Sequence, residues 1–440
     1  MRNRTTEPNE MKDVSVDHTQ NFEERIDVLR SLYGSSFAAQ FAGDLASIEF
    51  YFKTSQFVRH AIANLCWQGP GLRTNQPVDK SLGIEAWNLA REFELQARMT
   101  YSPPNAPLDL TRGATAFDDL VFMARYLTYL LRQMRNHAPQ LRQTPPPDVL
   151  EVPGRESKME RYWSSSDRTR PLLALSAALR QTMPRGVTPL IFGSMAEPPP
   201  WPQYADVDLA FYLSNSVIDS ATEMLGFFQS LRKLAPLIYK IDPIHHHEPY
   251  ILLETDCSQY SPAVLPLQTL RLATTFSDDP LVLKIFPLVE SRLFSLQALA
   301  RTHRELRRYR SRSFSFLDRY AAKNFLSVML LLPALLCGCL GRPVDKRSSF
   351  VIFKAEMNAD SVETIEMLER FRQEWHWTIF PPTQMLSIFG NKGIWLSRTV
   401  NRFPCLTTFT QLRHAAQRID LLIDGILGRL ELETRRGNNA

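Results

Sequence analysis

The sequence predicts an α+β fold in which a small mixed sheet near the middle of the chain is flanked by helical domains. Apolar residues recur at spacings of three and four in residues 22–137 and again from about 282 onward, whereas short apolar runs typical of strands lie between 188 and 254. The chain of 440 residues is long enough for two or three domains. Hydrophobic residues at 44% and charged residues at 22% exclude wholesale disorder and a fibrous repeat.

The first third of the chain predicts a helical domain followed by a linker. Residues 1–21 lack an apolar pattern and are expected to form a disordered lead-in. Residues 22–137 show helical spacing without strand-like alternation, so they are assigned to a helical N-terminal domain. Residues 138–166 contain three consecutive prolines and a run of serines, which predicts a linker.

Residues 167–280 predict the mixed α/β core. Its expected elements are a helix over 170–182, a strand over 188–192, a turn at Gly193-Ser194, a proline-rich loop, a strand over 207–213, a helix over 217–235 capped by Ser216 and Asp219, and two further strands over 237–244 and 250–254. This order of elements describes one small sheet with covering helices.

Residues 281–434 return to helical spacing and predict a C-terminal helical domain. The expected helices cover 282–310, 316–336, 361–375 and 408–432, and residues 435–440 are expected to form a frayed tail. The longest apolar stretch, 325–340, is shorter than the ~20 residues of a membrane span and is interrupted by Pro333. It predicts a buried, kinked helix, so no membrane partner is expected.

Charge and cysteine content point to a cytoplasmic protein. A formal net charge of +5 is weak evidence for a polyanionic partner on a chain of this length. Five cysteines without paired CxxC spacing do not make a closed disulfide framework. The N-terminus also lacks the apolar core of a signal peptide. The oligomeric state is left open.

The segment 190–213 carries the strongest functional signal in the chain. One apolar run ends at Gly193-Ser194, and a second begins at Asp206 and Asp208. Carboxylates two positions apart on a strand project to the same side and can hold a divalent cation between them. Gly193 permits a tight turn, and the Ser194 hydroxyl and backbone amides offer donors to phosphate. The pattern predicts a metal-assisted phosphate site.

These residues resemble the DNA polymerase β-like nucleotidyltransferase superfamily. Phe192-Gly193-Ser194 and Asp206-Val207-Asp208-Leu209 match its motif of an apolar strand, Gly-Ser, a loop and two alternating acids. The resemblance implies that the core is a nucleotidyltransferase core, that Ser194 binds the triphosphate and that Asp206 and Asp208 bind both metals, Mg²⁺ or Mn²⁺. It implies a third acid on a later strand, for which Asp242 is the first choice and Glu254 and Asp256 are competitors.

The same resemblance implies a lysine from the helical domain at the triphosphate. Lys323, with Tyr320 nearby, is the first candidate, and Lys346 is the second. The chain departs from many bacterial members after the Gly-Ser turn, where it has Met195-Ala196-Glu197 and then four prolines. Pro243, directly after Asp242, is a further departure. The loop difference leaves the choice of substrate open, and Pro243 predicts a bend in the strand where the third carboxylate must point.

The expected reaction is metal-dependent transfer of a nucleoside monophosphate from a nucleoside triphosphate to a hydroxyl, with release of pyrophosphate. The acceptor stays open among an RNA end, a nucleotide, a protein and a small molecule. The arginines between 301 and 312 are either an RNA contact or a solvated face. His245 and His247 are either metal or phosphate ligands or a polar strand end.

Two alternative functions remain. The pattern Arg132 to His137 at the end of a predicted helix resembles the catalytic motif of HEPN ribonucleases. The departures after Gly193-Ser194 and at Pro243 also allow a catalytically silent binding or antitoxin-like partner.

Overall fold

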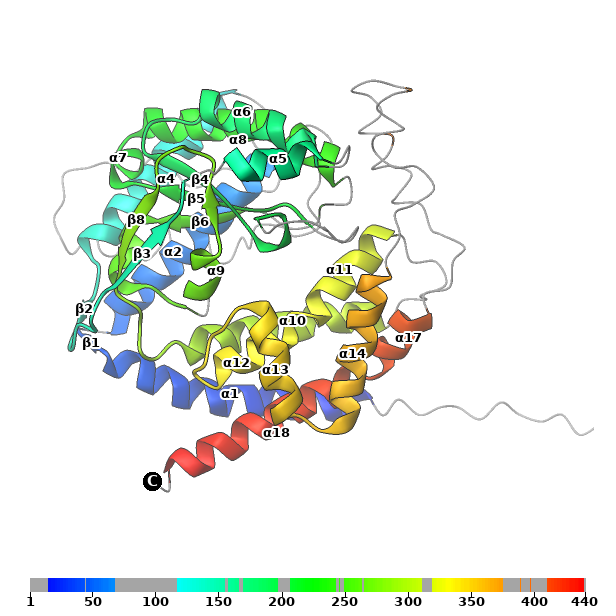
Figure 1. The fold of residues 1–440 in the computed structure, drawn as a ribbon. Helices are drawn as coiled ribbons and strands as arrows, with labels where there is room; N and C mark the ends of the chain where they lie inside the picture. Colours follow the sequence, from blue (N-terminus) through cyan, green and yellow to red (C-terminus); the bar gives the residue numbers. More distant parts are fainter. Residues whose placement is uncertain are drawn as a thin grey trace, which may run out of the picture.

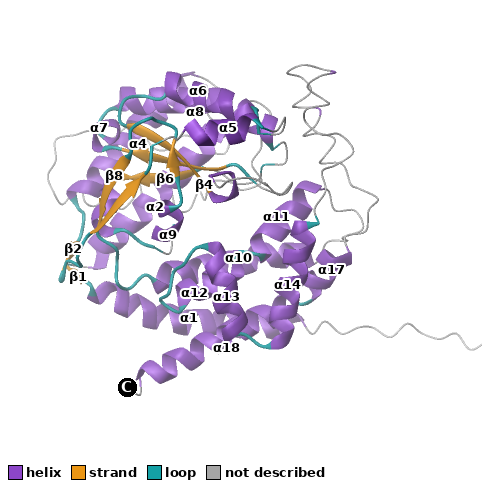
Figure 2. Cartoon of the chain, viewed as in Figure 1, coloured by secondary structure: helices purple, strands orange, loops and turns teal. Residues whose placement is uncertain are grey.

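The computed structural model describes residues 15–43, 45–67, 117–154, 157–165, 169–196, 206–242, 245, 249–262, 265–310, 319–374, 388, 396 and 410–438. Within these residues the chain forms two lobes with separate apolar cores (Figure 1). The sheet lobe contains the strands β3 to β8 and the helices packed on them, and the helical lobe contains α1 and the helices from α10 onward. Among the described residues, the sheets of β3 to β8 lie in the upper part of the view, and β1 and β2 lie lower at its left edge (Figure 2). The predicted α+β class is confirmed at this level.

A four-stranded mixed sheet forms the centre of the sheet lobe. Its order is β6-β5-β4-β7, with β4 antiparallel to β5 and β7, and β5 parallel to β6. The bounds are Val187–Phe192 for β4, Asp208–Leu213 for β5, Tyr250–Leu253 for β6 and Thr274–Thr275 for β7. The strands predicted over 188–192, 207–213 and 250–254 are therefore present.

Alternate residues of the sheet face two different apolar cores. In β5, Leu209 and Phe211 pack with four helices, which are α2 (Leu45–Trp67), α4 (Phe117–Asn136), α6 (Pro171–Thr182) and α8 (Ala221–Ile241). Ala210 instead packs with a second sheet. That second sheet pairs β3 (Asp148–Val152) with β8 (Leu281–Ile285). Asp208 has the same parity as Ala210, so its side chain leaves β5 on the side away from the helices.

The strand predicted over 237–244 is wrong, because helix α8 runs from Ala221 to Ile241. Leu234, Ile238 and Ile241 are buried at helical spacing, and this packing overrides the strand preference of the isoleucines. The helix also begins later than predicted. Its cap is Ser220, whose hydroxyl accepts from the Glu223 N–H at 3.2 Å. A short helix, α7 (Asn215–Ile218), precedes it.

The helices predicted as one N-terminal domain contribute to both lobes. Helix α1 (Ser15–Ala39) packs against α10 and α18 in the helical lobe, where it lies along the bottom of the view (Figure 1). Helices α2 (Leu45–Trp67) and α4 (Phe117–Asn136) instead pack on α8 over the sheet. An apolar helical face does not specify which core it will join.

The segment predicted as a linker contains regular structure. Its elements are β2 (Gln140–Leu141), which pairs with β1 (Phe41–Ala42), the strand β3, and helix α5 (Ser157–Ser164). Helix α6 (Pro171–Thr182) follows close to its predicted position. The three prolines precede β3 without interrupting it, because a proline just outside a strand removes no ladder hydrogen bond.

The helical lobe is formed by α1, α10 (Arg292–Arg310), α11 (Arg319–Met329), α12 (Leu332–Cys339), α13 (Lys346–Glu356), α14 (Ala359–Gln373), α17 (Thr410–Gln417) and α18 (Ile419–Asn438). The helix predicted over 282–310 is wrong at its start, because residues 281–285 form strand β8. Buried side chains alternate with exposed ones along this strand. The short helix α9 (Leu267–Arg271) precedes β7.

The stretch Arg319–Cys339 is long and apolar enough to cross a membrane by composition, but 72% of its apolar window is buried inside the fold. It breaks between Met329 and Leu332, and Pro333 lies in the first turn of α12. The predicted buried helix with an interruption near Pro333 is therefore present. It forms the centre of the helical lobe's core.

Candidate functional site

The Gly193-Ser194 turn brings strand β4 directly against Asp208. Gly193 follows Phe192, the register partner of Asp208, and begins a short 3-10 turn, Gly193–Ala196. Its φ of 68° lies in the left-handed region that favours glycine. A Cβ atom at Gly193 would overlap the Asp208 carboxylate oxygen Oδ2. Because Gly193 has no side chain, the Asp208 carboxylate can lie directly against the backbone of the turn. Ser194 is the next residue of this turn.

We expect Gly193→Ala to displace the Asp208 carboxylate and to strain the turn. The left-handed conformation costs a non-glycine residue about 1–2 kcal/mol. Thermal unfolding should reveal this loss, and any nucleotide transfer should fall more steeply than stability. Gly34→Ala is the matched control, because Gly34 lies in a helix and the added methyl group would meet nothing within 4 Å apart from its chain neighbours and the backbone of its own helix. A Gly193→Ala protein with unchanged stability and activity would contradict this account of the turn.

Asp206 and Asp242 meet around the ammonium group of Lys323. Asp206 lies two residues before β5, and Asp242 is the residue that ends helix α8. The Lys323 Nζ atom, carried by α11, is 2.7 Å from Asp242 Oδ2 and forms an ion pair with Asp206 Oδ1. The Lys323 side chain is 1% exposed and that of Asp242 is 0% exposed. A lysine of the helical lobe therefore joins two carboxylates of the sheet lobe.

Electrostatics favour a cation at this position. Burial lowers the pKa of Lys323, but the adjacent carboxylates of Asp206 and Asp242 outweigh it and raise the pKa above its usual value. Asp242 also lies at the carbonyl end of α8, where the helix dipole disfavours a negative charge. A buried carboxylate at such a helix end requires a nearby positive charge. Lys323 supplies it here.

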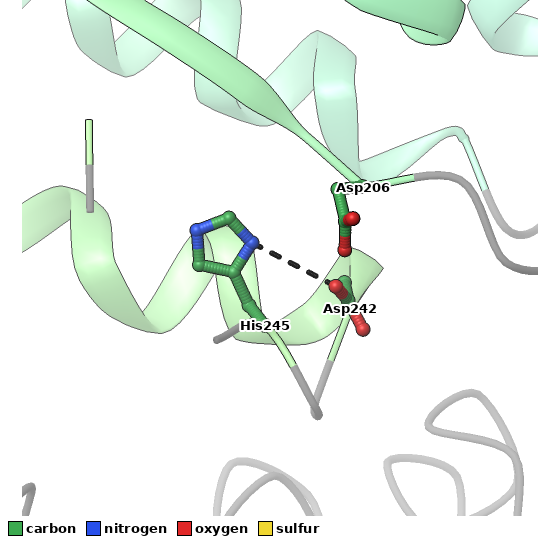
Figure 3. A group of neighbouring side chains, drawn as sticks. All are labelled: Asp206, Asp242 and His245. Atoms are coloured by element: carbon green, nitrogen blue, oxygen red, sulfur yellow. Dashed lines mark ion pairs between the residues drawn. The ribbon is translucent and has the colours of Figure 1, made fainter. Parts of the chain in front are cut away.

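His245 completes a group of three metal-ligand side chains. Its Nδ1 atom lies 3.7 Å from Asp242 Oδ2, and its side chain is 2% exposed. The ligand atoms of Asp206, Asp242 and His245 all lie within 4.8 Å of one another (Figure 3). Two carboxylates and an imidazole are a chemically suitable donor set for a divalent cation. The Lys323 ammonium already contacts the two carboxylates of this group, so a metal ion there would compete with it.

Asp208 lies outside this group of three and faces the Gly193 turn, so the structure separates the roles of the two alternating acids. The carboxylates of Asp206 and Asp208 both interact electrostatically with Lys346, the first residue of α13. Burial and the nearby Arg372 lower the pKa of Lys346 to about 8, and Asp208 and Asp206 partly oppose this shift. The second predicted lysine therefore also comes from the helical lobe toward the acids. Arg372, in the last turn of α14, is a neighbour that the sequence did not single out.

Glu254 and Asp256, the competitors for the third acid, lie at the other end of the sheet. They follow Leu253, which pairs with Leu213, five residues or about 17 Å along β5 from Asp208. Glu254 accepts from the Asn215 N–H at 2.6 Å. Asp256 accepts from the Ser55 hydroxyl at 2.9 Å, which anchors α2 to the end of β6. Of the three acids, Asp242 is the one placed beside Asp206.

The remaining predicted residues have other surroundings. Tyr320 lies one turn before Lys323 on α11 and packs against the core of the helical lobe. His247 and Arg312 lie outside the described residues.

Arg132 and His137, the residues of the ribonuclease hypothesis, lie at the end of α4. The Arg132 guanidinium donates to the Asp219 main-chain carbonyl, and its Nε atom is 3.7 Å from the Asp219 carboxylate. Arg135 Nη1 is 2.7 Å from the same carboxylate. The His137 ring packs edge-on against Phe50, and burial lowers its pKa. Both arginines thus fasten α4 to the residue that joins α7 to α8.

The pattern of alternating acids singled out Asp206 and Asp208, and the family resemblance singled out Asp242 and Lys323, but two features of their surroundings were missed. The helical position of Asp242 was missed because its segment reads as a strand. The approach of His245 to Asp242 was missed because His245 was placed on an extended strand with His247. Aspartate and histidine three residues apart after a helix are the signal that would have indicated it.

Comparisons with known proteins add no identification. No protein-family model, curated protein or solved structure gives a significant match to this chain. The case for a function therefore depends on the geometry of Asp206, Asp208, Asp242, His245 and Lys323 alone.

Proposed function

We propose that the protein is a metal-dependent nucleotidyltransferase that transfers a nucleoside monophosphate from a nucleoside triphosphate to a hydroxyl. The observation that carries the proposal is the buried meeting of Asp206 and Asp242 around a cation, beside a left-handed Gly193 that contacts Asp208. Divalent metal, Mg²⁺ or Mn²⁺, supplies charge stabilisation to the attacking and leaving oxygens in such reactions. The carboxylates of Asp206, Asp208 and Asp242 are the groups that would hold it.

Each residue then has a definite role. Gly193 and Ser194 present backbone amides and a hydroxyl to the triphosphate. Lys323 and Lys346 approach the acids from the helical lobe and are suited to neutralise phosphate charge. Asp242 is the group proposed to orient the acceptor hydroxyl. Lys323 must leave at least one of its two carboxylate partners when these accept another cation.

The acceptor proposed is an RNA end. Arg301, Arg304 and Arg308 are exposed on α10 at spacings of three and four, so they form one basic face of the helical lobe. Such a face can neutralise phosphates of a polynucleotide. The free, buried cysteines Cys257, Cys337 and Cys339 suit the reducing cytoplasm in which we place this reaction.

Incubation with each α-labelled nucleoside triphosphate, with Mg²⁺ or Mn²⁺ and with or without cellular RNA, tests the proposal. We expect label to move to an acceptor and pyrophosphate to appear in equal amount. If every triphosphate remains intact with both metals and all acceptor classes, the proposal is wrong.

A second candidate function is binding without turnover. The observation that favours it is the Lys323 ammonium itself, which already neutralises Asp206 and Asp242 within the fold. A silent protein of this kind would bind a nucleoside triphosphate or RNA and release no pyrophosphate. Equilibrium binding of a fluorescent triphosphate, measured beside the transfer assay, separates the two functions.

The pH dependence of transfer should report on Lys346. Its lowered pKa of about 8 means that the ammonium is present below this pH and is lost as the pH rises through it. Because kcat/KM reports groups of the free enzyme, kcat/KM for the triphosphate should fall above about pH 8. Lys346→Arg keeps the charge and should move the fall to higher pH. Identical profiles for the two proteins would exclude Lys346 from triphosphate binding.

A further inference from the structure

We propose that His245 is a metal ligand of this site and that it makes the site prefer a first-row transition-metal dication to Mg²⁺. The inference rests on the proposed function in that both use Asp206 and Asp242. It adds a nitrogen donor and a metal preference, neither of which the motif of two alternating acids supplies.

A main-chain hydrogen bond to the residue that ends α8 keeps His245 close to the carboxylates. The His245 N–H donates to the Asp242 main-chain carbonyl at 3.1 Å, which holds His245 beside Asp242. The imidazole lies beside the Asp242 side chain, with Nδ1 directed at the carboxylate and 3.7 Å from Oδ2 (Figure 3). Asp206 reaches the same place from the residues before β5. Three side chains from two segments thus direct one nitrogen and carboxylate oxygens to a common point.

Burial makes this donor set selective. The side chains of Asp242 and His245 are 0% and 2% exposed, and that of Asp206 is 13% exposed. Mg²⁺ takes oxygen ligands and gives up its water reluctantly, so a dry site with a nitrogen ligand suits it poorly. Imidazole binds the later transition metals well, and Mn²⁺ and Co²⁺ accept mixed nitrogen and oxygen ligands. The nitrogen ligand should therefore give the site a higher affinity for these transition-metal ions than for Mg²⁺.

The test uses the full chain and the metal ions alone, without nucleotide. Mn²⁺ binding is measured by EPR and Mg²⁺ binding by competition. We expect Mn²⁺ to bind at least about tenfold more tightly than Mg²⁺, and His245→Ala to lower Mn²⁺ affinity by about 10- to 100-fold. Mg²⁺ affinity should change much less. His303→Gln is the matched control, because His303 is also buried and lies 3.9 Å from an aspartate, Asp420, outside the site.

Pulsed EPR of Mn²⁺ bound to the unmodified protein gives a readout that needs no variant. A directly bound imidazole produces nitrogen coupling to the manganese, and this coupling should disappear in Asp206→Asn protein that no longer binds the ion. Absence of nitrogen coupling, or equal affinity for Mn²⁺ and Mg²⁺, would overturn the inference. Nucleotide transfer that depends on Asp208 in such a protein would leave the proposed function standing. Conversely, nitrogen-bound Mn²⁺ without any transfer would support the inference and refute the proposed function.

Discussion

Asp206→Asn and Asp208→Asn are expected to reduce nucleotide transfer by at least about a thousandfold while leaving the protein folded. Each change removes one negative charge and keeps the side chain's shape. A thousandfold loss corresponds to about 4 kcal/mol of transition-state stabilisation, which is within what metal-bound carboxylates provide. Pyrophosphate release measures the effect, with circular dichroism as the check on folding.

Glu254→Gln is the matched control for these two variants. Glu254 is a carboxylate at the opposite end of β5, and the amide oxygen of glutamine can still accept from the Asn215 N–H. We expect its activity to remain close to that of the unmodified protein. Full activity in Asp206→Asn or Asp208→Asn protein would refute the assignment of the catalytic centre, as would an equal loss in all three variants.

Lys323→Met should destabilise the metal-free protein by about 3–5 kcal/mol, because it leaves two carboxylates buried without their cation. The loss should appear as a lower thermal midpoint. Mn²⁺ should then restore more stability to Lys323→Met than it adds to the unmodified protein, because the ion replaces the missing ammonium. Binding to the folded state alone raises stability with metal concentration.

Lys354→Met provides the comparison with an ordinary ion pair. Lys354 pairs with Glu366 at 2.8 Å, and both side chains are more than 40% exposed. Such an exposed pair contributes little to stability because water screens it, and no rescue by Mn²⁺ is expected. If Lys323→Met is as stable as the unmodified protein, or if Mn²⁺ has the same effect on both, Asp206 and Asp242 do not form a cation site.

The sequence predicted those parts of the fold that depend on neighbouring residues. Strands β4 and β5 follow from short apolar runs, and the turn between them follows from Gly193-Ser194. The contact of Gly193 with Asp208 is a consequence of the same hairpin, since Phe192 and Asp208 are register partners. These features need only local propensity and strand alternation.

Long-range packing decided the rest. Lys323 and Asp242 are 81 residues apart, and no spacing rule relates a helix of one lobe to the end of a helix in the other. The strand predicted over 237–244 failed because buried apolar residues extend α8 to Ile241. Likewise, the amphipathic helices α1 and α2 show similar local patterns but pack in different lobes. Tertiary context overrides propensity in each case.

The most direct test of the account is the position of Mn²⁺ in crystals grown with the ion and a non-hydrolysable nucleoside triphosphate. If Asp206 and Asp242 hold the metal, an anomalous peak is expected at coordination distance from both, with the triphosphate against the Gly193-Ser194 turn and Lys323 moved from between the carboxylates. Crystals in which Lys323 still bridges Asp206 and Asp242, with manganese bound elsewhere or absent, would contradict it.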